Sequence, residues 1–268
     1  MSYPGSPAPS RLRRALRPVL AAAVDLIYPR LCCGCKAPLE PGEPRTGIQT
    51  WFCPACEKNL PWLDAPYCRV CGETYDGSFS AEFRCMNCSG RRLEFEFAIA
   101  ACHAEDTVRE LVHQFKYERR LQLRGALATL LLRTLDEPRL SRESLASWLL
   151  VPVPLHRERE KEREFNQSWE LCQRLQRLTG VPAAKALART RETDAQAGLD
   201  REERLQNLRG AFSLRKTWPW QKKPPLQGRS ILLVDDVFTT GATTSECARV
   251  LRREGGAQKV VVITVARG

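Results

Sequence analysis

The chain has 268 residues, of which 43% are hydrophobic. This length and composition allow the buried core of an α/β domain and a second, smaller domain, and they exclude a disordered chain. Its formal net charge of +11 favours phosphates, nucleic acid or acidic proteins as partners, although an Arg-rich composition can also reflect a basic proteome. No apolar run reaches the ~18 residues of a membrane-spanning helix, so we expect no stable membrane insertion.

The first 28 residues are predicted to form a leader and an N-terminal helix. Residues 1–10 are rich in Pro, Ser, Gly and Ala, which is typical of disordered segments. From Leu12 to Ile27, apolar residues recur with a helical period. This stripe predicts a helix packed on the fold or, alternatively, a helix that docks on a partner or a membrane surface. The stretch contains Asp25 and lacks a convincing signal-peptide cleavage site, so a cytoplasmic location is expected.

Eight cysteines form four Cys-x2-Cys pairs in the next segment, residues 29–92. Two such pairs can close around one tetrahedral zinc ion, and pairing neighbours along the chain closes the shorter loops. We therefore predict a double zinc ribbon with two structural Zn²⁺ sites. The expected ligands are Cys32, Cys35, Cys53 and Cys56 in the first site, and Cys68, Cys71, Cys85 and Cys88 in the second.

Two alternatives concern these cysteines. Cys33 could replace Cys32 as a ligand, but only one residue would then separate it from Cys35, which strains the turn. Disulfides are the other alternative, and the regular spacing without a secretion signal favours metal. The isolated Cys102, Cys172 and Cys247 are expected to be buried, inert thiols.

Residues 93–268 are predicted to form an α/β domain, a mainly parallel sheet flanked by helices, because strand and helix patterns alternate. Strands are expected at 95–102, 148–153, 210–214, 231–234 and 259–265. Helices are expected at 107–115, 121–135, 166–178, 201–208 and after residue 244. Residues 183–200 are interpreted as a loop with a short strand, and residues 216–227 as a linker.

The stretch from Ser230 to Glu246 predicts a strand, an acidic pair, a turn around Gly241 and a helix start. Free N–H groups at a helix start bind anions, and glycine allows close approach to a phosphate. Asp235 and Asp236 directly follow the expected strand and would bind neutral hydroxyls or a cation, because they repel a phosphate. The pattern therefore predicts a sugar-phosphate site. Alternatively, residues 243–246 only form a capping box.

A charged run from His156 to Glu164 follows the expected strand at 148–153. Its acidic and basic residues balance, which is typical of a solvated helix. Alternatively, because the run leaves the carboxyl end of a strand, Arg157, Arg159 or Arg163 reaches a diphosphate.

The acidic pair and its Thr-Thr-Gly-x-Thr loop resemble the motif with which type I phosphoribosyltransferases bind phosphoribosyl diphosphate (PRPP). The chain as a whole resembles the ComF family (ComF/GntX). The matching words are Asp25-Leu26-Ile27-Tyr28-Pro29, Phe115-Lys116-Tyr117, Val151-Pro152-Val153-Pro154, Phe165-Asn166-Gln167-Ser168 and Gly210-Ala211-Phe212. One departure is Glu164, where the family usually has Gly. A side chain there disfavours a positive φ, and a carboxylate beside a diphosphate is unfavourable unless it points away.

The resemblance implies a phosphoribosyltransferase-like domain after the zinc ribbons. By analogy, Asp235 and Asp236 act as the catalytic pair on the ribose, and Arg157 or Arg163 binds the diphosphate. The residues implied to bind the 5-phosphate are Thr239, Thr240, Gly241, Ala242 and Thr243. Mg²⁺ would accompany PRPP.

The implied role is assistance to DNA uptake in natural transformation, through single-stranded DNA or partner binding. One alternative is an active phosphoribosyltransferase of nucleotide metabolism, whose acceptor the sequence does not identify. The other is a zinc-ribbon scaffold for a helicase-like competence protein.

Overall fold

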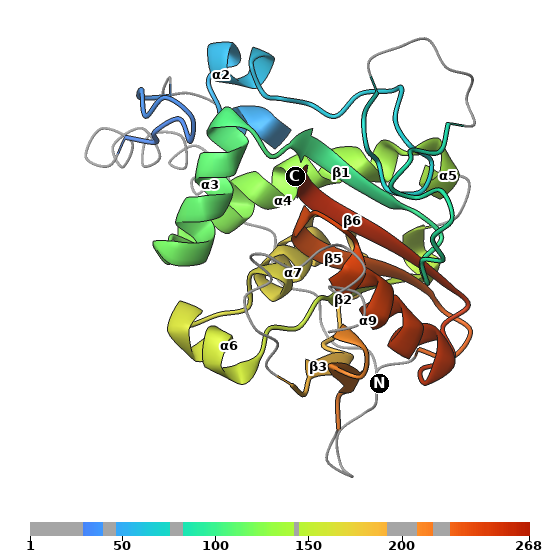
Figure 1. Cartoon of the computed structure of the whole chain (residues 1–268). Coiled ribbons are helices and arrows are strands. Elements are labelled where there is room, and N and C mark those ends of the chain that lie inside the picture. The colour runs from blue at the N-terminus through green and yellow to red at the C-terminus, as the bar shows by residue number, and fades with distance from the viewer. Residues whose placement is uncertain (1–28, 40–46, 76–82, 142–144, 192–207, 217–225) are drawn as a thin grey trace, which may run out of the picture. The chain divides into compact units, whose positions relative to one another are not determined.

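The computed structural model describes residues 29–39, 47–75, 83–141, 145–191, 208–216 and 226–268 (Figure 1). The predicted leader and N-terminal helix lie outside the described residues. So do most of the helix expected at 201–208 and most of the linker expected at 216–227. Contacts within the chain divide it into two compact units, Met1–Asn59 and Leu60–Gly268. The domain boundaries after residues 28 and 92 stay predictions.

The first unit contains two short helical elements, η1 (Gly47–Thr50) and α2 (Pro54–Lys58). Cys53 is the N-cap of α2, and its sulfur accepts a hydrogen bond from the backbone N–H of Cys56. Pro54 occupies the first turn, where its missing N–H costs nothing.

The second unit is built on a four-stranded parallel sheet with the order β1-β6-β5-β2. Its strands are β1 (Ala98–His103), β2 (Trp148–Pro152), β5 (Ser230–Phe238) and β6 (Lys259–Arg267). A separate antiparallel pair consists of β3 (Leu187–Arg189) and β4 (Phe212–Leu214). The described α-helices are α3 (Asp106–Tyr117), α4 (Arg124–Leu132), α5 (Pro138–Ser141), α6 (Arg157–Arg163), α7 (Gln167–Thr179) and α9 (Ala242–Arg253). The 3-10 segments are η2 (Leu121–Leu123), η3 (Arg133–Asp136) and η4 (Leu145–Ser147). The predicted mainly parallel sheet flanked by helices is confirmed.

Two sequence-based boundaries were wrong. The strand expected to end before Asp235 continues to Phe238, because β6 offers backbone partners along that whole length, with Phe238 opposite Arg267. The helix expected over 121–135 is divided into η2, α4 and η3.

Helices cover both faces of the sheet (Figure 1). α4 packs on β1 and β6, and α7 packs on β2 and β5. On the other face, α9 shares one core with alternate β5 residues such as Ile231 and Leu233. The neighbouring strands β2 and β5 are thus followed by helices on opposite faces, and open α/β sheets bind ligands at the carboxyl ends of such strands.

Among the helices of the described residues, none is both long enough and apolar enough to cross a membrane.

Candidate functional site

The acidic pair lies near the carboxyl end of β5, and each carboxylate is held by a different helix. Asp235 Oδ1 accepts a hydrogen bond from Ser168 Oγ of α7 at 2.9 Å and another from the backbone N–H of Asp236 at 3.0 Å. Asp236 pairs with the Lys116 ammonium of α3 at 2.7 Å. The side chains of Lys116 and Asp236 are 19% and 8% exposed, so this ion pair is largely shielded from water.

Burial and neighbouring charges shift the pKa values of Asp235 and Lys116. Burial and then the Asp236 charge raise the pKa of Asp235 to about 7, although Lys116 and the Ser168 hydroxyl act in the opposite direction. Burial acts to lower the pKa of Lys116, but the Asp236 carboxylate outweighs it and the pKa is raised. Lys116 therefore stays charged beside Asp236, whereas Asp235 exchanges a proton near neutral pH.

Sequence reasoning assigned no role to Lys116 or Ser168. Both lie within segments that resemble the ComF family, Phe115-Lys116-Tyr117 and residues 165–168. This resemblance was the signal that could have pointed to the two residues. Nothing in the local pattern showed that α3 and α7 bring them to β5, because the three segments are far apart in the chain.

The predicted phosphate loop forms the turn from β5 into α9. Gly241 is the N-cap of α9 with φ +76°, a left-handed conformation that favours glycine. A Cβ on this residue would lie 2.7 Å from Cζ of Phe238, so both conformation and space require glycine. Thr240 Oγ1 accepts a weak hydrogen bond from the N–H of Ala242 at 3.4 Å, and Thr239 is exposed. The loop therefore presents helix-start N–H groups and hydroxyls to an anion.

The capping-box interpretation of residues 243–246 was wrong. The helix already includes Ala242, and its N-cap makes no side-chain hydrogen bond. The Glu246 carboxylate instead accepts from the backbone N–H of Gly210 at 2.9 Å and pairs with Arg249 at 2.9 Å. Glu246 thus ties α9 to the chain just before β4.

The two arginines predicted to bind diphosphate lie at different places. Arg163, at the end of α6, stands over the ring of Tyr117 at 5.0 Å and donates to Gln167 Oε1 at 3.2 Å. Its charge also acts on Lys116, so it lies in the vicinity of the acidic pair. Arg157, at the start of α6, lines a separate pocket whose described wall includes none of the phosphate-loop residues.

Glu164 adopts the conformation that the family's glycine would favour. It ends α6 with φ +67°, in the left-handed region. Its carboxylate forms an ion pair with Arg119, which also donates to the backbone carbonyl of Glu162 at 3.0 Å. The negative charge is thus partnered by an arginine, at a conformational cost of about 1–2 kcal/mol.

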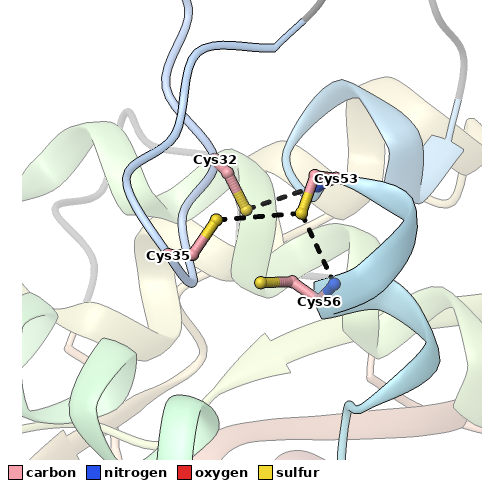
Figure 2. A group of neighbouring side chains, drawn as sticks. All are labelled: Cys32, Cys35, Cys53 and Cys56. Carbon is pink, nitrogen blue, oxygen red and sulfur yellow. Dashed lines mark hydrogen bonds between the residues drawn. The ribbon is translucent and has the colours of Figure 1, made fainter.

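The first cysteine group brings together the sulfurs of two Cys-x2-Cys pairs (Figure 2). The ligand atoms of Cys32, Cys35, Cys53 and Cys56 all lie within 4.8 Å of one another, and the Cys35 and Cys53 sulfurs are 3.8 Å apart. Zinc–sulfur bonds of about 2.3 Å in a tetrahedron imply sulfur separations of about 3.8 Å. Although burial opposes it, backbone N–H donors, first that of Cys53, lower the pKa of Cys32 to about 6. The group therefore fits a structural zinc ion.

The second group, Cys68, Cys71, Cys85 and Cys88, is fully buried and has its four sulfurs within the same 4.8 Å limit. The Cys71 and Cys85 sulfurs are 3.5 Å apart, and the backbone N–H of Cys85 donates to Cys68. A hydrogen bond from Cys88 lowers the pKa of Cys71 to about 5, against the effect of burial. This group also fits a structural zinc ion.

Arg267 connects the second cysteine group to the phosphate loop. Its guanidinium is buried, pairs with Glu73 and donates to the backbone carbonyl of Phe238 at 3.2 Å. One small cavity is lined by residues of both regions, including Cys71 and Thr240. The second group and the phosphate loop therefore belong to one packed region of the Leu60–Gly268 unit.

The other cysteines stay outside both groups. Cys33 is not part of the first group, and burial raises the pKa of its thiol. Burial also raises the pKa of Cys102 to about 12 and the pKa values of Cys172 and Cys247 well above their ordinary value. These thiols are therefore weak nucleophiles and weak ligands.

Comparison with known proteins places these features in a family. A family model described as a double zinc ribbon domain matches residues 23–93. The chain is 32% identical over 234 residues to the DNA utilization protein YhgH of Escherichia coli K12, covering 87% of this chain and 95% of that protein. It is 30% identical to competence protein F of Haemophilus influenzae, over 76% of this chain and 85% of that one. It is 27% identical to competence protein ComFC of Bacillus subtilis, over 80% and 83%.

Among solved structures, a phosphoribosylpyrophosphate synthetase from Mycobacterium smegmatis matches 52% of this chain and 33% of its own, with 19% identity and a TM-score of 0.27, which is too low for any conclusion. The sequence relatives are sufficient: at this identity and coverage, the chain belongs to the ComF family.

Proposed function

We propose that the chain binds PRPP with Mg²⁺ at the carboxyl ends of β5 and β2. The observation that carries the proposal is the joint placement of the acidic pair and the Gly241 turn on one strand–turn–helix unit, where neighbouring strands are followed by helices on opposite faces of the sheet. The N–H groups that start α9 can bind a 5-phosphate, and the carboxylates of the preceding strand can accept hydrogen bonds from a ribose diol.

Each residue of the site has a distinct part in this binding. Asp235 and Asp236 accept hydrogen bonds from the ribose hydroxyls. Lys116 pairs with Asp236 and holds it in place, and Ser168 orients Asp235. Arg163, beside the pair, supplies positive charge toward the diphosphate. Mg²⁺, when bound with PRPP, neutralises the charge of the diphosphate.

We place this pocket in a protein of DNA handling. The relatives are named for DNA utilization and competence, which supports a competence-related role for this chain. The net charge of +11 supports contact with single-stranded DNA, whose phosphates release counterions when cationic side chains bind them. In this role the PRPP site binds a ligand that need not be turned over.

Titration calorimetry with PRPP and Mg²⁺ tests the pocket. We expect the wild type to bind and the Asp236→Asn variant to lose affinity at least about tenfold, because it removes a ribose acceptor and leaves Lys116 without its carboxylate. The matched control is Arg177→Gln, an exposed residue late in α7 and away from the acidic pair. Absence of binding by the wild type would refute the proposal.

A second candidate function, transfer of the phosphoribosyl group, is favoured by the pKa of Asp235, which is raised to about 7, first by burial. A group that titrates near neutral pH can accept the proton of an attacking nucleophile. In the reaction, a bond forms between the nucleophile and C1 of PRPP while the C1–oxygen bond breaks and diphosphate leaves. Diphosphate release measured against a panel of bases and amines tests this function, and no release with any acceptor counts against it.

A further inference from the structure

A set of contacts within the Leu60–Gly268 unit runs from the second cysteine group to the phosphate loop. Glu73 comes two residues after Cys71, and its backbone carbonyl accepts a hydrogen bond from the N–H of Cys68 at 2.7 Å. This bond closes the turn that brings Cys68 and Cys71 together. The Glu73 carboxylate forms an ion pair with Arg267 at the end of β6. The place of this carboxylate therefore depends on the fold of the cysteine turn.

Arg267 contacts the residue directly before the phosphate loop in two ways. Its guanidinium donates to the carbonyl of Phe238 at 3.2 Å and lies over the Phe238 ring, 5.3 Å from the ring centre. The Arg267 side chain is only 8% exposed. A buried cation is unstable without a partner, and among the described residues the Glu73 carboxylate is the acid that pairs with it. Glu73 therefore holds Arg267 in the position from which it contacts Phe238.

The Phe238 ring in turn packs against the glycine of the loop. A Cβ on Gly241 would lie 2.7 Å from Cζ of the ring, so the ring and the turn are in close contact. The ring also packs edge-on against the buried ring of Phe95, with ring centres 6.0 Å apart. A shift of Phe238 would therefore move the turn whose N–H groups start α9.

Little free space separates the cysteine group from the loop. The cavity that both regions line has a volume of about 10 Å³, the room of at most one water molecule. Cys71 and Cys88 line it together with Thr239 and Thr240. Because the two regions are packed this closely, disorder in the cysteine turn would disturb the loop.

We propose that Glu73 and Arg267 are positioning residues for the proposed 5-phosphate site, and that they couple this site to zinc binding at the second cysteine group. The inference rests on the proposed PRPP binding and adds a means of regulating it. The four thiolates fold the turn around Glu73 only when a metal ion holds them together. Glu73 then fixes Arg267, Arg267 fixes Phe238, and the loop presents its N–H groups without a further cost of ordering. Removal of the metal should therefore weaken PRPP binding.

Titration calorimetry with PRPP and Mg²⁺ measures the contribution of the two residues. Glu73→Gln should bind PRPP about tenfold more weakly than wild type and retain both zinc ions, because no cysteine is changed. The conservative Glu73→Asp should recover part of this loss, since it keeps the carboxylate. Glu73→Gln/Arg267→Gln should lose no more affinity than Arg267→Gln alone, because the two residues act through one contact. The matched control is Glu57→Gln, an acid directly after Cys56 of the first group, which should bind as wild type.

Because coupling between two sites is reciprocal, PRPP should also strengthen zinc binding at the second group. Equilibrium competition with a zinc chelator, with and without saturating PRPP and Mg²⁺, measures this effect in two cysteine variants. Cys53→Ser, which leaves the second group intact, should hold its zinc ion about tenfold more tightly in the presence of PRPP. Cys85→Ser, which leaves only the first group intact, should show no change.

Absence of PRPP binding by the wild type would refute the proposed function and this inference with it. If the wild type binds PRPP, two results would each overturn the inference and leave the proposed function standing. One is a PRPP affinity of Glu73→Gln equal to that of the wild type. The other is a zinc affinity of Cys53→Ser that PRPP leaves unchanged.

Discussion

Replacing Asp235 with asparagine is expected to stabilise the protein above neutral pH. Asparagine keeps an oxygen that can accept from Ser168 Oγ and from the backbone N–H of Asp236, the two hydrogen bonds that Asp235 accepts. It removes the carboxylate whose ionisation is disfavoured first by burial and then by Asp236. The substitution therefore separates the cost of the charge from the loss of contacts.

The pKa gives the size and sign of the effect. The pKa of Asp235 rises from an ordinary value of 3.8 to about 7 on folding. At a pH between these two values, the folded state therefore holds a proton that the unfolded state has lost. The contribution of Asp235 to stability is complete below pH 3.8 and is lost as the pH rises to about 7. At 1.36 kcal/mol per pKa unit, the ceiling is about 4 kcal/mol, and remaining solvent contact reduces the expected gain to about 2 kcal/mol.

Urea unfolding at pH 5 and pH 8, followed by circular dichroism, measures this difference for Asp235→Asn against wild type. The gain should be present at pH 8 and small at pH 5. Asp236→Asn is the matched variant with the opposite sign: it should destabilise by about 2–3 kcal/mol, because it leaves Lys116 shielded from water without its partner. A loss of stability in Asp235→Asn at pH 8, or a gain that does not change with pH, would refute the reasoning.

Three further predictions concern the phosphate loop and the metal groups. Gly241→Ala should cost about 2 kcal/mol in urea unfolding and weaken PRPP binding, because of its φ of +76° and its contact with Phe238; wild-type affinity would contradict the role of this turn. Arg267→Gln should weaken PRPP binding about tenfold in calorimetry, because it removes the donor to the Phe238 carbonyl; an effect on stability alone would limit Arg267 to a structural role. Metal analysis should find about two zinc ions per wild-type chain and about one in either the Cys53→Ser or the Cys85→Ser variant. Only Cys85→Ser should lower the melting temperature of the Leu60–Gly268 unit. An unchanged metal content in both variants would contradict the zinc assignment.

The sequence by itself determined the features that depend on neighbours along the chain. Spacing within each Cys-x2-Cys pair, the apolar run before Asp235 and the Gly241 turn are local patterns, and they predicted two four-cysteine groups and a parallel sheet with an anion-binding turn. The sequence segments that match the ComF family, in the same order along the chain, added the ComF assignment, which the relatives confirm.

Only the tertiary structure decided what surrounds the acidic pair. Lys116 and Ser168 reach β5 because α3 and α7 pack around the sheet, and neither helix carries a local signal for that contact. Arg157 and Arg163 are equivalent in a sequence of alternating charges, yet one faces a basic pocket and the other Tyr117, since opposite ends of α6 meet different partners. The extension of β5 through both aspartates has the same origin: strand length is set by the backbone partner across the sheet, which the local sequence does not contain.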